Sequence, residues 1–205
     1  MIKSIGKFFK AASGRRAGGE SIFHPTEKCP DCATPLMRVE ETWRCPNLDC
    51  PAQIRARIEH WCSPGAMDIP GGDAAFVAVL VENGLVRDVA ELYRLKVPEI
   101  AALPGMNKDL AQKFFDAIVT SRKRDAWRVL FGLSIPRVSA VEAQSLCRHF
   151  ASVDNVFAAS TERLVEADGV SEVVARCIVD WHGDSVNRKL VERLYKASVN
   201  FKARL

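Results

Sequence analysis

The chain has 205 residues, of which 48% are hydrophobic and 26% are charged. These proportions are typical of a folded globular protein, and they exclude a mainly disordered, a collagen-like or a membrane-embedded chain. The net charge of +4 arises in the first 24 residues, so binding of a polyanion by the nearly neutral remainder would depend on where its individual cations lie.

Residues 1–23 form a basic arm in which lysines alternate with isoleucine and phenylalanine, followed by three glycines. This pattern predicts a short amphipathic helix over residues 2–12 and then a flexible hinge. The arm is suited to a membrane surface, to DNA, or to no partner at all as a solvated terminus. Because Lys7 and Lys10 interrupt the apolar positions, we expect no cleaved leader.

Residues 24–64 contain most of the cysteines, in the two groups Cys29-Pro30-Asp31-Cys32 and Cys45-Pro46-Asn47-Leu48-Asp49-Cys50. Paired thiolates at this spacing close a tetrahedron around Zn²⁺. The intervening residues 35–44 alternate in polarity, which predicts a short β-hairpin. So short a segment has too little apolar material for its own core, and a structural metal replaces that core. The alternative is a redox Cys-x-x-Cys pair beside incidental thiols.

The remaining cysteines, Cys62, Cys147 and Cys177, occur singly in helical patterns, where a free cysteine usually behaves as a small buried hydrophobe. The chain shows no pattern of a disulfide-rich secreted domain, and this cysteine usage is typical of a reducing compartment.

Residues 65–205 contain a fourfold repeat with helical periodicity. The repeated five-residue segments are Ile69–Asp73, Leu103–Asn107, Ile135–Ser139 and Ala167–Ser171, and their third residues are spaced 34, 32 and 32 residues apart. Small or apolar residues follow each segment at matching distances: first Val77, Ala111, Ala143 and Ala175, then Leu80, Phe114, Leu146 and Ile178. Each unit is therefore predicted to be a helix end, a tight turn and a second helix that approaches the first closely.

The fifth residue of every segment is a preferred helix N-cap: Asp73, Asn107, Ser139 and Ser171. Ser139 is followed by Glu142 in the spacing of a capping box. A helix that begins there has unpaired N–H groups and a positive partial charge, which together favour a phosphate. The alternative is that the caps only start the helices of an α-helical domain.

These motifs resemble the zinc-finger and helix-hairpin-helix region of bacterial NAD-dependent DNA ligases, over about residues 24–200. The resemblance is carried by both cysteine groups, by Trp43–Asn47, Cys50–Gln53, Ile58–Trp61, Ala66–Ile69, Leu80–Val86, Leu92–Leu95, Leu130–Leu133 and Arg148–Phe150. It implies a mainly α fold, in which a small four-cysteine zinc module (24–64) precedes an α-helical domain of four helix-hairpin-helix repeats (65–205). In that family the repeats hold double-stranded DNA by backbone contacts across the minor groove.

The resemblance and the spacing of the cysteines together imply that Cys29, Cys32, Cys45 and Cys50 bind a structural Zn²⁺. We expect no catalytic residue in the chain. Candidate phosphate partners are the turn residues and nearby cations, including the dense basic run at 122–124. The expected DNA contacts are Gly105, Met106, Asn107, Lys108, Arg122, Lys123, Arg124, Arg137, Val138, Ser139, Gly169, Val170, Ser171 and Arg176.

Two departures from the family pattern affect the expected function. The catalytic Lys-x-Asp-Gly motif of the adenylation domain is absent from the sequence, so we expect the chain as given not to activate a nick. The family's turn glycines are replaced in every repeat, and Asp73 brings a carboxylate to the first turn. We expect that turn to be degraded as a DNA contact.

The sequence therefore predicts a non-catalytic, sequence-independent protein that binds double-stranded, including nicked, DNA in repair or replication. We expect no small-molecule substrate, no membrane partner, and a cytoplasmic, nucleoid-associated location in a bacterium. Two alternatives stay open. The chain is a subunit of a split ligase with a separate adenylation partner, or it is a scaffold that binds protein and has lost its affinity for DNA.

Overall fold

The computed structural model of the protein describes residues 28–39, 42–47 and 49–203. The expected helix over residues 2–12 lies outside them. Within the described residues, the elements are β1 (Met37–Val39), β2 (Thr42–Arg44), α1 (Pro51–Cys62), α2 (Ala74–Glu82), the 3₁₀ helix η1 (Glu91–Arg94), α3 (Val97–Ala101), α4 (Lys108–Ser121), α5 (Ala126–Gly132), α6 (Ala140–Phe150), α7 (Val153–Ala158), α8 (Thr161–Leu164), α9 (Glu172–Gly183) and α10 (Ser185–Lys196). The predicted mainly α fold is confirmed.

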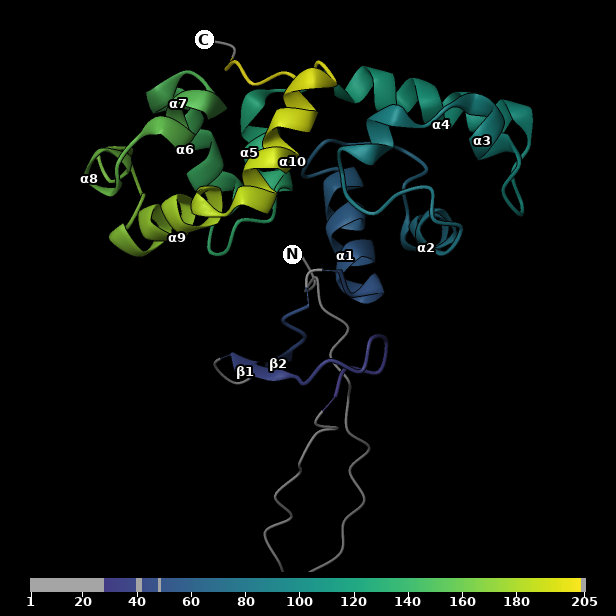
Figure 1. Ribbon diagram of the computed structural model, residues 1–205. Coiled ribbons are helices and arrows are strands. Elements are labelled where there is room, and N and C mark those ends of the chain that lie inside the picture. The colour runs from purple at the N-terminus through teal and green to yellow at the C-terminus, as the bar shows by residue number, and fades with distance from the viewer. Residues whose placement is uncertain (1–27, 40–41, 48, 204–205) are drawn as a thin grey trace, which may run out of the picture.

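The helices are arranged in two groups above a small β-hairpin (Figure 1). One group contains α1–α4, the other contains α6–α9, and α5 and α10 lie where the groups meet. The strands β1 and β2 pair antiparallel with Met37 opposite Arg44, as the alternating sequence predicts. This β-hairpin lies beyond the N-terminal end of α1, away from the helical groups.

Four pairs of helices, α1/α2, α3/α4, α5/α6 and α8/α9, are joined by the four repeated segments, which we call the first to fourth hairpin turns. In every turn the amide of the fourth residue donates to the carbonyl of the first residue, and each N···O distance is 3.1 Å. The third residue has positive φ in every turn: +89° at Gly71, +76° at Gly105, +63° at Arg137 and +74° at Gly169. This bond and this φ define a type II turn, and the proline that precedes three of the four residues suits it.

The second helix of each pair begins at the predicted cap. The side chains of Asp73, Asn107, Ser139 and Ser171 accept hydrogen bonds from amides in the first helical turn of α2, α4, α6 and α9. Behind the caps, the small or β-branched residues Val77, Ala111, Ala143 and Ala175 are fully buried. The core therefore follows the repeat, because each buried small residue lets its helix pack closely on the partner helix.

The first turn differs from the others because its fourth residue, Gly72, has no side chain to contribute to the core. A Cβ atom there would lie 2.6 Å from Cβ and 2.7 Å from Sγ of Cys62, the last residue of α1. The corresponding Val138 and Val170 are buried apolar side chains. Cys62 thus fills the space that a turn side chain fills in the third and fourth repeats, which confirms its predicted role as a small buried hydrophobe.

The two helix groups meet at a joint formed by α1, the loop 63–68 and α5. Trp61 is fully buried there and lies against Gly132, where an added Cβ would approach the indole to 2.8 Å. His60 Nε2 lies 2.9 Å from the carbonyl oxygen of Phe131. Arg128 on α5 donates to the carbonyls of residues 64 and 66, so a side chain of this central helix holds the loop that follows α1.

The left-handed residue of the second turn can be tested without a packing effect. A methyl group at Gly105 meets no atom within 4 Å, so Gly105→Ala costs only the strain of an L-residue at positive φ, about 1 kcal/mol of unfolding free energy. Gly183, which ends α9, also has open space but no positive φ, so Gly183→Ala is the matched control and is expected to cost almost nothing. Urea denaturation measures both, and equal losses would contradict the turn assignment.

The pairing of Gly72 with Cys62 predicts non-additive mutations. Gly72→Ala forces a methyl group into the Cys62 side chain and is expected to cost about 1–3 kcal/mol of unfolding free energy. Adding Cys62→Ala removes the thiol and is expected to recover part of that loss. A double-mutant cycle measured by urea denaturation gives the coupling, and a coupling energy of zero would contradict the packing described.

Candidate zinc centre and nucleic-acid interface

The four cysteines of the N-terminal module converge on one point. Their Sγ atoms all lie within 4.8 Å of one another; Cys29 and Cys50 are 3.7 Å apart, and Cys32 and Cys45 are 3.5 Å apart. A regular tetrahedron with Zn–S bonds of about 2.3 Å has sulfur atoms about 3.8 Å apart. The arrangement therefore fits Zn²⁺ without a change of backbone.

Local turns bring each pair of thiols together. In the first pair, Cys29 donates its amide to Thr34 O and accepts the Ala33 amide, both at 2.8 Å, while Ala33 has φ of +57°. In the second pair, the Asn47 side chain accepts the Asp49 amide at 2.9 Å, and its carbonyl accepts the Cys50 amide at 3.1 Å. In these turns Cys29 and Cys50 are buried, whereas Cys32 and Cys45 are half-buried.

The thiols differ in how readily they ionise. The Thr34 hydroxyl, 3.2 Å from Sγ of Cys32, and the Thr34 amide lower the pKa of Cys32 to about 6. Burial raises the pKa of Cys45 to about 12 and also raises the pKa of Cys50. Because zinc binds thiolates, binding must release the protons of the latter two thiols, and affinity falls as the pH is lowered.

Four sulfur ligands complete the preferred coordination of Zn²⁺ and leave no position for a substrate. The donor set thus fits a structural zinc ion, which would be held by Cys29, Cys32, Cys45 and Cys50. Cys177, which is half-buried on α9, belongs to no such cluster among the described residues.

The thiol cluster is attached directly to the helical groups. Cys50 is the N-cap of α1, Pro51 occupies its first turn, and Arg55 on the next turn forms a 2.9 Å ion pair with Asp31 between the first two cysteines. The other end of α1 carries Trp61 at the joint. The position of the Cys50 thiol is therefore linked to the start of a helix that ends in the core. The domain border near residue 64 stays a prediction.

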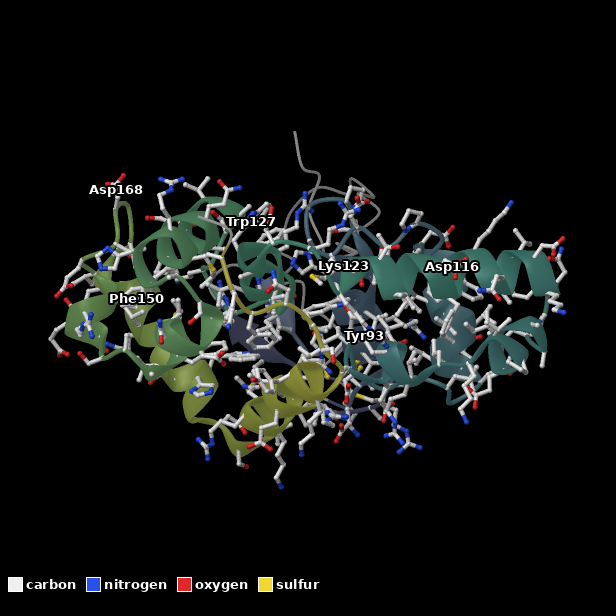
Figure 2. The ribbon with its side chains drawn as sticks, turned by 90° about the horizontal axis from the view of Figure 1, so that it is seen from above. Tyr93, Asp116, Lys123, Trp127, Phe150 and Asp168 are labelled. Atoms are coloured by element: carbon white, nitrogen blue, oxygen red, sulfur yellow. The ribbon has the colours of Figure 1, made fainter. Side chains whose placement is uncertain are left out.

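The hairpin turns present their polar groups unequally. The amides of Met106, Val138 and Val170 are bonded within the turns, and the side chains of the two valines are buried. What the turns offer to solvent is the start of the following helix: the caps Asn107, Ser139 and Ser171 are exposed, as is Lys108 in the first position of α4. Figure 2 shows Asp168 at the tip of the fourth turn, projecting from one edge of the protein.

Carboxylates lie closer to the turns than the sequence indicated. The Glu142 carboxylate accepts the Ser139 amide at 3.0 Å, and the Ser139 hydroxyl holds the pKa of Glu142 below its usual value. Arg176 is paired with Glu172 in the first turn of α9. Together with the exposed carboxylate of Asp73, Glu142 places negative charge beside the first and third turns, whereas at the fourth turn Arg176 offsets the charge of Glu172.

The basic run between the second and third turns is partly engaged inside the protein. Arg122 donates to the Tyr93 carbonyl at 3.2 Å and lies over the Tyr93 ring, and Arg124 forms an ion pair with Asp68. Lys123 lies between them and is exposed. Residues 68 and 124 are far apart in the sequence, so the sequence alone does not predict this ion pair.

Comparison with known proteins supports both parts of the fold. Residues 28–52 match the family model of the NAD-dependent DNA ligase C4 zinc finger domain, and residues 128–191 match that of the helix-hairpin-helix motif. A DNA ligase of Rubrobacter xylanophilus is 39% identical over 188 residues, which are 91% of this chain and 27% of the relative. A DNA ligase of Chlorobium chlorochromatii is 40% identical over 192 residues, which are 92% of this chain and 29% of the relative.

The chain thus spans somewhat more than a quarter of the length of these curated relatives. The resemblance to the zinc-finger and helix-hairpin-helix region of bacterial NAD-dependent DNA ligases is confirmed, as is the fit of the cysteine module to a structural Zn²⁺. Among the described residues, none of the helices has the length and hydrophobicity to cross a membrane.

The zinc ligands can be tested by substitution. Cys32→Ser removes one thiolate and is expected to abolish stoichiometric zinc binding and to lower the thermal midpoint, because metal binding contributes to folding in small modules. Cys177→Ser, outside the cluster, is the control and is expected to retain one zinc per chain. Metal content by mass spectrometry and calorimetric unfolding measure the two effects; a full zinc complement in Cys32→Ser would contradict the ligand set.

Proposed function

From its resemblance to the zinc-finger and helix-hairpin-helix region of NAD-dependent DNA ligases, we propose that the chain is a non-catalytic module that binds double-stranded DNA, including nicked DNA, without reading its sequence. It acts in DNA repair or replication. The module contributes affinity for the duplex, and no group in it performs the chemistry of ligation.

The observation that carries this proposal is the equivalence of the four hairpin turns. All share one hydrogen bond of 3.1 Å, one left-handed residue and one capped helix start. A helix start concentrates N–H groups and positive partial charge, and it favours phosphate whatever the base sequence. Contacts of this kind position a protein on DNA without specifying bases.

The charges beside each hairpin turn indicate how much that turn contributes to DNA affinity. The second turn has the cation Lys108 next to the cap Asn107, although Asp109 follows in the first turn of α4. The first turn has the Asp73 carboxylate at the cap itself, and the third has Glu142 bonded to the Ser139 amide. We expect the second turn to dominate and the first to contribute least, so the affinity is modest and strongly dependent on salt.

A second candidate function is a scaffold that binds protein. It is favoured by apolar side chains that are exposed beside the third and fourth turns: Val141 is 72% exposed and Val173 is 56% exposed. Combined with the carboxylates already described, these residues form a surface that is poorly suited to a polyanion. The two candidates differ in whether the duplex binds at low salt.

The experiment is a fluorescence-anisotropy titration of a short labelled duplex, intact and nicked, over a range of salt concentrations. The wild type is expected to bind unrelated sequences equally, with an affinity that falls steeply with salt. Lys108→Gln should reduce the slope of log K against log salt by about 1. Lys189→Gln, an exposed lysine on α10 away from the turns, is the control and should leave the slope unchanged.

Two outcomes would contradict the proposal. Absence of binding to any duplex at low salt favours the protein scaffold. Binding whose slope is unaffected by Lys108→Gln means that the second turn does not contact the backbone.

A further inference from the structure

A hollow of about 430 Å³ lies where the C-terminal end of α4 meets the segment after α10. It is lined by Arg122, Lys123, Ser198, Asn200, Lys202 and Ala203. Figure 2 shows Lys123 near the middle of the protein, between Trp127 and Tyr93. We propose that this hollow, at the junction of the two helix groups, is a phosphate-binding site.

Hydrogen bonds hold the walls of the hollow in place. The Asn200 amide donates to Arg122 O at 2.8 Å, and its side chain donates to Arg124 O at 3.1 Å and to Lys202 O at 3.0 Å. On the far side, the amides of Val153 and Ala203 make bonds of 2.9 Å that fix the segment against the start of α7. The backbone that carries the lining residues is thus fixed before any ligand arrives, which reduces the entropy lost on binding.

The lining is cationic. Three of its six residues carry a positive charge and none carries a carboxylate. Within the part of the chain that the structure describes, no ion pair involves Lys202. Lys123 also lines the neighbouring hollow of about 280 Å³, with Arg124, Arg128 and the carboxylate of Asp125. A concave surface with charge of one sign attracts an anion more strongly than a flat surface does.

The hydrogen-bonding groups suit phosphate among anions. Ammonium groups such as that of Lys202 act as point charges with three donors, and the Ser198 hydroxyl adds a neutral donor at the rim. Arg122 donates to Tyr93 O at 3.2 Å and its Nε is buried, so this guanidinium contributes mainly its positive charge to the wall of the hollow. Several donors converging on one hollow match an anion with several acceptor oxygens.

A phosphate site in this hollow gives the residues of the basic run at 122–124 different roles. Lys123 and Lys202, 79 residues apart in sequence, are the ligand-binding residues. Arg124 is a positioning residue, because its ion pair with Asp68 and its carbonyl bond to Asn200 hold the junction together.

The first test uses inorganic phosphate and the zinc-loaded full chain, followed by ¹⁵N NMR, with chloride at matched ionic strength as the control. Saturable shifts are expected at the amides of Lys123, Ser198 and Lys202. Lys123→Gln and Lys202→Gln should each weaken phosphate about tenfold, as expected for loss of a charge-assisted hydrogen bond, and Lys189→Gln should not. Shifts that do not saturate, or variants that bind like the wild type, would overturn the proposal.

The second test identifies the source of the phosphate and rests on the proposed function. If the source is the DNA backbone, Lys202→Gln should reduce the salt slope of duplex binding by about 1, independently of Lys108→Gln. An unchanged slope with intact phosphate binding assigns the hollow to a free phosphate. If the wild type binds no duplex, the function proposed above fails, and the phosphate titration alone decides the hollow.

Discussion

A single backbone constraint organises the helical part of the protein: the third residue of each hairpin turn must adopt a left-handed conformation. Only this conformation lets the fourth residue donate back to the first, so that the second helix starts with its cap exposed and its small residue facing the core. Glycine meets the constraint at Gly71, Gly105 and Gly169. Arg137 meets it with strain, which the buried Val138 and the capped start of α6 help to hold in place.

The zinc module and the helical groups are connected through α1, which contributes residues to both. Its first residues are fixed by Cys50 and by the Arg55–Asp31 ion pair, and its last turn places Trp61 against Gly132. A zinc ion bound by the four thiols would therefore do more than replace a missing core in a short segment. Through Cys50 it would also fix where α1 begins and the direction from which that helix enters the joint.

The features that depend on residues close together in the sequence could be predicted from the sequence. Caps, turn positions, buried small residues and the β-hairpin follow from local chemistry, and so does the close spacing of Cys29 with Cys32 and of Cys45 with Cys50. The meeting of the two pairs was inferred from zinc chemistry. Contacts between distant segments were not predictable, because no period links Arg124 to Asp68 or Asn200 to Arg122. The sequence accordingly predicts that Arg122, Lys123 and Arg124 all contact DNA, whereas in the fold Arg122 and Arg124 make contacts inside the protein.

Trp61 packs so closely on Gly132 that a methyl group would not fit between them, and this contact ties α1 to α5 at the joint. Such tight packing at the joint favours one fixed arrangement of the first and second turns relative to the third and fourth. On the function proposed here, a duplex whose phosphates are spaced differently from the hairpin turns must itself bend or untwist in order to bind all of them. Preference among DNA substrates would then follow their deformability, and intact and interrupted strands would be distinguished by stiffness alone.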